Sequence, residues 1–243
     1  AKQHNATIFM AVHAAFNLVL SRYSNQFDFV VGTTVANRMQ SELQGIVGPF
    51  LNTLALRANV EHDIFSDYLG HIREVNLAAQ ANQDIPFQQV LERLGLERKH
   101  LDNPLVQIYL SMNNNDTPML ALPDVSFSRL SEDESLVKTD LKVRALIVDN
   151  QLRFSWVFDT SVFDDTLITG LADSLSRVLA AVVATPDIRM RDIPVLSAEQ
   201  TAELLAVNHT EQVVDVQDIV SGILTQATRQ PTATALVTPH TTV

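Results

Sequence analysis

The sequence contains no cysteine in its 243 residues. This excludes disulfide bonds, thiolate nucleophiles and thiolate metal ligands. Glycine is also scarce, with seven residues. These glycines form no phosphate-binding loop ending in Lys-Ser or Lys-Thr, no Gly-x-Gly-x-x-Gly turn and no Gly-x-Ser-x-Gly elbow. The sequence therefore lacks the usual signatures of nucleotide-binding enzymes and of serine hydrolases.

Positive charge is sparse as well. The chain has 17 Lys and Arg residues against 28 Asp and Glu residues, which gives a formal net charge of −11. Binding to nucleic acid or to an anionic membrane needs clustered basic residues, and the sequence has no such cluster. No apolar run approaches the ~20 residues of a membrane span, and the first residues lack the pattern of a signal peptide. We therefore expect a soluble, cytoplasmic protein without nucleic-acid or membrane partners.

The periodicity of the apolar residues predicts a mixture of helices and strands. Apolar positions three and four residues apart predict helices over Thr7–Tyr23, Ile64–Ala81, Asp84 to Gly95 and Asp164 to Ala184. Asp164 or Asp165 is expected to cap the last of these helices. Short β-branched stretches predict strands over Phe27–Thr34, Asn52–Val60 and Leu105–Ser111. Because the strands and helices do not alternate strictly, we expect an α/β (mixed α+β) fold with a mixed sheet.

The clearest β signal is a hairpin. Two predicted strands, Lys138–Val148 and Gln151–Asp159, flank Asp149-Asn150, a dipeptide that suits a two-residue turn. In the second strand, every other residue is a large apolar one: Leu152, Phe154, Trp156 and Phe158. We therefore expect one aromatic face of this strand to be buried.

The seven histidines are scattered along the chain. His71 and Glu74 share one helix face at positions i and i+3, which would place two metal ligands together, but no third ligand follows in register. A solvated helix face is the favoured interpretation, and we expect no metal site. His13 lies beside Ala14 and Ala15 in the first predicted helix, which indicates a core or boundary position.

Three short segments carry the most information. The first reads GPFLNTL over residues 48–54 and is followed by Arg57, the second reads NQDIPF over residues 82–87, and the third is Asn103-Pro104-Leu105. In the first segment, Gly48 is expected to permit a turn that a residue with a Cβ would disfavour.

The other residues of these segments also have structural interpretations. Phe50 is expected to fill a core position, and Asn52 and Thr53 to satisfy free backbone groups where a loop becomes a strand. In the second segment, Asp84 and Pro86 are expected to begin a helix, with the Asp84 carboxylate as its cap and with Phe87 packing its first turn. In the third, Asn103-Pro104 is expected to begin a strand where proline need not donate a hydrogen bond. For all three segments, scaffold roles are favoured over direct chemistry.

In their order along the chain, the three segments resemble motifs of the condensation domains of nonribosomal peptide synthetases. The first resembles Gly-x-Phe-x-Asn-Thr, the second (His/Asn)-Gln-Asp-x-Pro-Phe, and the third the Asn-Pro-Leu core of a longer motif. The stretch VGTTVANR, which ends at Arg38, is similar to the family's sequence before the first motif. Asp102 stands where the family usually has arginine, so the ion pair of that arginine is not expected here. The resemblance covers about residues 6–208.

The resemblance implies the C-terminal lobe of a two-lobe fold like that of chloramphenicol acetyltransferase, with a mixed sheet flanked by helices. It implies the acceptor-side lobe of an enzyme that forms amide bonds between carrier-bound aminoacyl or peptidyl thioesters. The family's His-His-x-x-x-Asp-Gly motif belongs to the N-terminal lobe and does not occur in this sequence. We therefore expect no catalytic residue in this chain, and we expect the chain alone to be inactive.

The resemblance also implies site residues and partners. The residues expected to shape the substrate tunnel and its scaffold are Arg38, Gly48, Phe50, Asn52, Thr53, Arg57, Gln83, Asp84, Pro86, Phe87, Asn103 and Pro104. No cofactor is expected to bind directly, because phosphopantetheine is delivered on partner carrier domains. The expected partners are the N-terminal lobe, the upstream and downstream peptidyl carrier domains, and an adjacent adenylation domain. The segment Asn113–Leu130 is expected to reach towards the N-terminal lobe.

The C-terminal part of the chain resembles a linker from Ile193 to Thr210 and the opening of an adenylation domain from Ala227 to Val237. We therefore expect the condensation-domain lobe over residues 1–186, a linker over residues 187–211, and the truncated start of an adenylation domain over residues 212–243.

Two alternatives stay open. The chain could belong to an epimerisation or heterocyclisation variant of the same fold, or to a non-catalytic module that docks carrier domains. The motif that discriminates between them lies in the N-terminal lobe, so these residues do not decide the matter.

Overall fold

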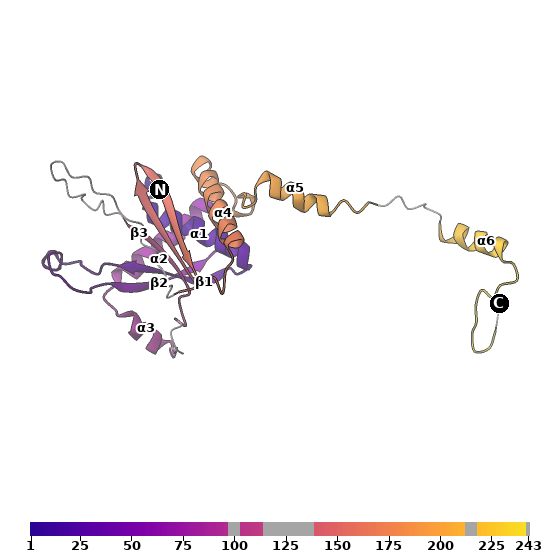
Figure 1. Ribbon diagram of the computed structural model, residues 1–243, viewed down its shortest axis with the longest axis horizontal. Helices are drawn as coiled ribbons and strands as arrows, with labels where there is room; N and C mark the ends of the chain where they lie inside the picture. The colour runs from indigo at the N-terminus through magenta and orange to yellow at the C-terminus, as the bar shows by residue number, and fades with distance from the viewer. Residues whose placement is uncertain (97–102, 114–138, 212–217, 242–243) are drawn as a thin grey trace. The chain divides into compact units, whose positions relative to one another are not determined.

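The computed structural model describes residues 1–96, 103–113, 139–211 and 218–241 (Figure 1). Asp102 and the part of Asn113–Leu130 beyond Asn113 lie outside the described residues. The chain forms two compact units, Ala1–Ser197 and Ala198–Val243.

The helices and strands of the first unit are α1 (Ile8–Ser24), β1 (Asp28–Val35), β2 (Asn52–Asn59), α2 (Phe65–Ala81), α3 (Phe87–Arg93), β3 (Ile108–Asn113), β4 (Leu141–Val148), β5 (Gln151–Phe158) and α4 (Asp165–Ala184). Short 3₁₀ helices are η1 (Lys2–His4), η2 (Ser41–Leu43) and η3 (Met190–Asp192). The second unit contains α5 (Ala198–Val207) and α6 (Ile219–Arg229). Each of these predicted elements is present, and most bounds agree to within one or two residues, although α3, β3 and β4 each begin three residues later than expected.

Five strands form one mixed sheet in the order β2-β1-β3-β4-β5. The outer pairs, β1 with β2 and β4 with β5, are antiparallel, whereas β3 runs parallel to both β1 and β4. Parallel neighbours need a crossover connection, and α2 and α3 lie in the chain between the β1–β2 pair and β3. The expected mixed α/β fold is confirmed.

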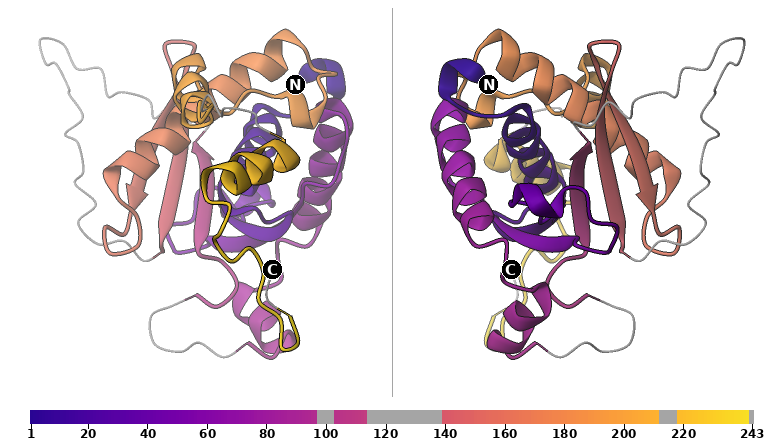
Figure 2. Two further views of the ribbon diagram at one scale, coloured as in Figure 1. Left: turned by 90° about the vertical axis from the view of Figure 1, so that its right-hand side faces the viewer. Right: turned by 90° about the vertical axis from the view of Figure 1, so that its left-hand side faces the viewer.

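Three helices, α1, α2 and α4, share one hydrophobic core with the sheet (Figure 2). Eleven of the 17 residues of α1 are buried, and α1 contacts both α2 and α4, so it is the central helix. Thr7 caps α1 through the amide of Met10 (3.2 Å). The cluster includes Phe16 from α1, Ile72 from α2 and Leu175 from α4. Helix α3 lies apart from these three helices (Figures 1 and 2).

The strands β1 and β3 meet in a single registered pair, Gly32 opposite Tyr109. A Cβ added to Gly32 would overlap Cγ1 of Val106 and would lie 2.9 Å from Cε1 of Tyr109. Glycine is therefore required here by close approach, because no side chain fits between the strand and these two residues.

The predicted hairpin is confirmed. Asp149 and Asn150 have φ values of 51° and 58°, as a type I′ turn requires, and β4 and β5 pair in register from Leu141–Phe158 to Val148–Gln151. Trp156 meets the ring of Phe16 edge-on, with 6.1 Å between the centroids. The four apolar side chains of β5 are only half-buried, because β5 is an edge strand.

Helix α4 is, within the described residues, the one helix long and apolar enough to cross a membrane by length and composition. Asp164 caps it through the amide of Leu167 (2.7 Å), as the sequence predicts. Its apolar residues Leu171, Leu175 and Val178 are buried in the core of the first unit, so α4 is a packed helix of this lobe.

The segment after α4 is attached to the first unit beside the start of α2. The amide of Met190 donates to the carbonyl of Asp63 (2.8 Å). The amide of Phe65 donates to the carbonyl of Ile188 (3.0 Å). The side chains of Met190 and Ile193 are buried, so this part of the chain belongs structurally to the lobe.

His13 is fully buried in α1, which confirms its predicted core position. Nδ2 of Asn76 donates to the carbonyl of Ile72 (2.7 Å) and lies 3.2 Å from Nδ1 of His13. Because the amide group is the donor, Nδ1 of His13 accepts, which requires the neutral imidazole. Burial lowers the pKa of His13 to about 3.

The close approach at Gly32 predicts that Gly32→Ala lowers the free energy of unfolding by about 3 kcal/mol, as overpacking of a core does. Urea unfolding measures this value. Gly70→Ala is the matched control, since no atom lies within 4 Å of a Cβ at Gly70. In that helical position alanine should stabilise by about 1 kcal/mol. An unchanged midpoint for Gly32→Ala would contradict the close packing of β1 against β3.

The neutral His13 predicts a loss of stability in acid. Between pH 6.5 and 3 the unfolded chain protonates this histidine while the folded chain does not. The free energy of unfolding should therefore fall by about 1.4 kcal/mol for each pH unit below 6.5 from this residue. In His13→Gln the decrease should be smaller by that amount, as measured by urea unfolding at pH 7, 6 and 5. His209→Gln, which removes an exposed histidine, should keep the wild-type slope, and equal slopes in all three proteins would refute the assignment.

Candidate functional site

Asn52, the first residue of β2, joins this strand to the turn before α3. Its Nδ2 donates to the carbonyls of Gln83 (2.8 Å) and Ile85 (2.7 Å). Its Oδ1 accepts from the amides of Thr53 (2.9 Å) and Phe87 (3.1 Å). One carboxamide thus uses its full hydrogen-bonding capacity on four backbone groups. The expected backbone role of Asn52 is confirmed, and it links the first two motifs.

This contact also caps α3. Phe87 begins α3, and its amide is one of those that a helix N-terminus leaves unpaired. The expectation that Asp84 caps the helix is wrong, because Pro86 holds the N-cap position without a side-chain hydrogen bond and Asp84 is exposed. Asn52 binds the amide instead. The expected end of the helix is confirmed by Gly95, which has a φ of 66°.

Arg38 organises the loop between β1 and β2, which projects from one end of these strands (Figure 1). Its guanidinium donates to the carbonyls of Leu43, Ile46 (2.7 Å) and Gly48 (3.1 Å). The same group lies 4.3 Å from the centroid of the Phe50 ring, within cation–π distance. A single side chain therefore holds the inner side of the whole loop.

Two expectations for the first motif are wrong. Gly48 does not have a positive φ, and an added Cβ would make only an ordinary contact of 3.4 Å with the Phe50 ring. Phe50 is half-buried and lies outside the hydrophobic core. The physical reason in both cases is Arg38, which fixes the loop through the Gly48 carbonyl and holds the Phe50 ring against its own guanidinium.

Asn103 arranges the chain before β3. Its Oδ1 accepts from the amides of Leu105 (3.2 Å) and Val106 (3.1 Å), and its Nδ2 donates to the hydroxyl of Tyr109 (3.2 Å). These amides are therefore not available to a strand, which explains the late start of β3. The third motif holds Val106 and Tyr109 in the position where they pack against Gly32.

Arg57 lies at the other end of β2. Its guanidinium forms a two-bond ion pair with Asp28 of β1 at 2.8 and 2.6 Å, and the pKa of the Asp28 carboxyl is lowered by this contact. Both side chains are more than half exposed, so solvent screens the pair. Motif matching did not identify Asp28, but the antiparallel register of β1 and β2 would have found it.

The residues singled out from the sequence therefore occupy separate places. Arg38, Gly48 and Phe50 form the loop, whereas Asn52, Thr53, Gln83, Asp84, Pro86 and Phe87 meet at the start of β2. Asn103 and Pro104 precede β3, and Arg57 is distant at the end of β2. Tyr109, which the motifs did not indicate, links Asn103 to Gly32.

His62, in the connection before α2, forms an aromatic group with Tyr68 and His71 on the first turns of α2. The two imidazole centroids are 5.1 Å apart, and the His62 ring lies 5.3 Å from that of Tyr68. Burial, and then the charge of His62, lowers the pKa of His71. In the described part of the chain, no three His, Asp or Glu side chains are grouped so that they could hold a metal ion.

From the four hydrogen bonds of Asn52 we expect that Asn52→Ala leaves the amide of Phe87 without its acceptor. The free energy of unfolding of the lobe should fall by about 2 kcal/mol, because backbone groups lose their partners. Hydrogen exchange at the Phe87 amide should accelerate before global unfolding. Asn59→Ala is the control, since Asn59 makes a single local bond at the opposite end of β2. Equal protection of the Phe87 amide in both variants would contradict the capping role.

The sequence is similar to known proteins over most of its length. The sequence model described as "Condensation domain" matches residues 1–205. Bacitracin synthase 3 of Bacillus licheniformis is 31% identical over 240 residues, which cover 98% of this chain and 4% of that protein. Surfactin synthase subunit 2 of Bacillus subtilis (strain 168) is 32% identical over 212 residues, covering 87% and 6%. The chain thus spans only a small part of these relatives.

Solved structures share the fold. A four-domain nonribosomal peptide synthetase bound to AMP and glycine superposes with a TM-score of 0.73 at 23% identity, covering 100% of this chain and 20% of that one. The X-domain from teicoplanin biosynthesis gives 0.72 at 24% identity, covering 80% and 45%. The expected lobe architecture is confirmed by these likenesses. With a family match over most of its length and the family's motifs joined within one lobe, the chain belongs to the condensation domain family of nonribosomal peptide synthetases.

Proposed function

We propose that this chain is the acceptor-side lobe of a condensation domain that forms amide bonds between carrier-bound aminoacyl or peptidyl thioesters. The match of the family's sequence model to residues 1–205 carries the proposal. In the reaction, the amine nitrogen of the downstream aminoacyl group attacks the carbonyl carbon of the upstream thioester. A C–N bond forms, the C–S bond breaks, and the amine proton ends on the released thiol.

This lobe contributes orientation to the reaction. The acceptor amine must be held close to the thioester carbonyl, and correct placement of two reactants lowers the barrier without any chemical group from the lobe. The rigid joints at Asn52 and Asn103 support such a role, since each fixes several backbone groups. We propose that these motif residues shape the tunnel wall.

The proton-transfer group comes from the N-terminal lobe. The His-His-x-x-x-Asp-Gly motif does not occur in the sequence, and His13 is buried and neutral near pH 7. His62 and His71 lie against each other and against Tyr68. On this proposal the chain alone does not form amide bonds.

The loop held by Arg38 is the proposed contact surface for the N-terminal lobe. Its inner side is fixed, while Met39, Val47 and Leu51 are exposed at 73%, 101% and 73%. An exposed apolar set of this kind on an ordered loop is typical of a protein contact. Burying these side chains would stabilise the assembled domain.

Residues 212–243 are proposed to begin an adenylation domain. Helix α6 is capped by Asp218 through the amide of Ser221 (2.6 Å). Val220, Ile223 and Leu224 recur at helical spacing and are exposed, so this helix presents an apolar stripe that suits packing in a larger domain. Phosphopantetheine would arrive on the carrier domains, and the cytoplasm is the proposed location.

A docking module is the second candidate function. A structure described as the complex of the X-domain and OxyB from teicoplanin biosynthesis has a TM-score of 0.68 with this chain at 24% identity. The same fold is thus found in a protein complex, which favours a binding role as the alternative.

The experiment mixes the chain with two loaded carrier proteins, with and without a separately expressed N-terminal lobe, and detects dipeptidyl thioester by mass spectrometry. Product is expected only when both lobes are present. Arg38→Gln should reduce product at least about tenfold at limiting N-terminal lobe, because a loop without its guanidinium anchor is less ordered. Arg229→Gln, an exposed change of equal charge, should have no effect.

Product from the chain alone would refute the placement of the catalytic group. Carrier binding without product from the two lobes together would instead support the docking module.

A further inference from the structure

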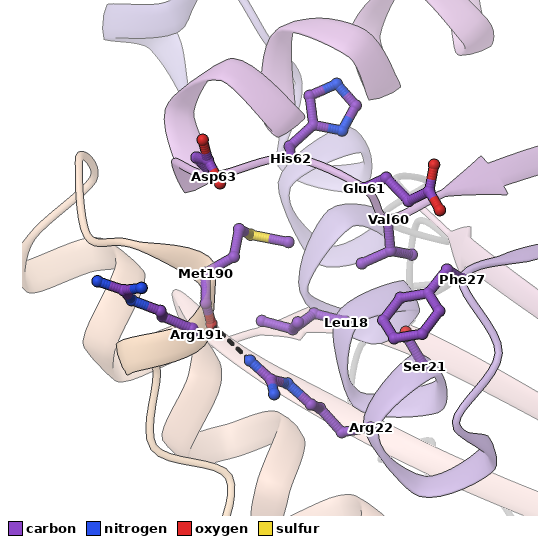
Figure 3. Close-up of a pocket in the computed structure, with 10 residues that line it drawn as sticks. All are labelled: Leu18, Ser21, Arg22, Phe27, Val60, Glu61, His62, Asp63, Met190 and Arg191. Atoms are coloured by element: carbon purple, nitrogen blue, oxygen red, sulfur yellow. Dashed lines mark hydrogen bonds between the residues drawn. The ribbon is translucent and has the colours of Figure 1, made fainter.

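A pocket of about 460 Å³ opens at the end of β2 that is remote from Asn52. Four parts of the first unit form it: the last turns of α1, Phe27 before β1, the connection from β2 to α2, and the η3 segment (Figure 3). Its volume lies in the range of roughly 300–1,000 Å³ typical of small-molecule sites. None of the motif residues lines it, so it is separate from the proposed tunnel.

The floor of this pocket is apolar. Leu18 and Met190 are buried, and Val60 lies beside them (Figure 3). Phe27 stands at the rim with half of its surface exposed, at 49%. A ligand with an apolar body would therefore find both a floor and an aromatic wall.

Charged groups of opposite sign flank the floor. Arg22 and Arg191 lie on one side in Figure 3, and Glu61 and Asp63 lie on the other. Nη2 of Arg22 donates to the carbonyl of Met190 (2.9 Å), which fixes the guanidinium at the pocket. A guanidinium has five N–H donors. Within the described residues, no carboxylate forms an ion pair with the guanidinium of Arg22.

We propose that this pocket binds a zwitterionic ligand with apolar side chains, either a free apolar amino acid or a dipeptide of two such residues. The ligand's carboxylate pairs with Arg22, its ammonium group lies near Glu61 and Asp63, and its apolar side chains contact Leu18 and Met190. Each part of the pocket then meets a group of matching chemistry. A purely apolar ligand would leave both charged walls unmatched, and a simple anion would leave the floor and the acidic wall unused.

Occupancy of the pocket has a structural effect. Met190 and Arg191 belong to the segment after α4, whereas the rest of the pocket belongs to α1, to Phe27 before β1 and to the connection from β2 to α2. A bound peptide therefore contacts both parts at once and stabilises the attachment of this segment to the lobe. Binding to the folded state alone should stabilise it by RT ln(1 + [L]/Kd), so the unfolding midpoint should rise with the logarithm of ligand concentration above the Kd.

The test titrates the full 243-residue chain with L-leucyl-L-leucine and follows amide chemical shifts by NMR. Saturable shifts are expected at residues 18–27, 60–63 and 188–192, with a Kd on the order of 1 mM or tighter for an open site. Blocking the ammonium group by N-acetylation, or the carboxylate by amidation, should each weaken binding at least about tenfold. Glycylglycine, which lacks the apolar side chains, should not saturate.

Variants separate this site from general binding. Arg22→Gln should weaken binding about tenfold, and Asp63→Asn should do so while its backbone contact with Met190 is kept. Arg189→Gln, an exposed change that does not line the pocket, should leave the Kd unchanged. Shifts that map elsewhere, equal affinity for the blocked peptides, or no saturation would each overturn the proposal.

Discussion

The close contact of β1 with β3 at Gly32 is the constraint on which the lobe depends. The sheet consists of an antiparallel pair, β2 with β1, and a three-stranded part, β3 to β5, and one registered residue pair joins them. Val106 and Tyr109 occupy the space where a side chain of residue 32 would lie. Both parts of the sheet share one core with α1. The position of this contact therefore determines where the first two motifs lie relative to the third.

Two asparagines connect the strands of this sheet to the neighbouring loop segments. Asn52 satisfies backbone groups from two separate segments, and Asn103 satisfies two amides and the Tyr109 hydroxyl. A short amide side chain suits this task, because it both donates and accepts at fixed geometry. The motif asparagines therefore hold chain segments together, and they do so through hydrogen bonds to backbone groups.

The fold could be predicted from the sequence to the extent that its signals were local. Hydrophobic period, the Asp149-Asn150 turn and the cap at Asp164 each depend on a few neighbouring residues, and the structure confirms them. The cap of α3 was assigned wrongly because its true acceptor, Asn52, is 35 residues away from Phe87. Local pattern contains no information on such a pair.

The same limit explains the errors in the first motif. Gly48 and Phe50 were interpreted as isolated residues, whereas Arg38, ten positions before Gly48, determines the surroundings of both. Family resemblance identified which residues belong together in sequence. It did not specify which atoms they bind, since that depends on how β1, β2 and α3 are packed.

The attachment of the segment after α4 has a consequence for the exchange of modules between synthetases. If two parent proteins were fused at residue 186, the second parent would replace Met190 and Ile193, which are buried in the lobe. It would also replace Val195, whose carbonyl accepts from Ser174 and Arg177 of α4. A recombination point after Ser197, where the first compact unit ends, leaves these contacts within one parent, so a chimera joined there keeps a native interior.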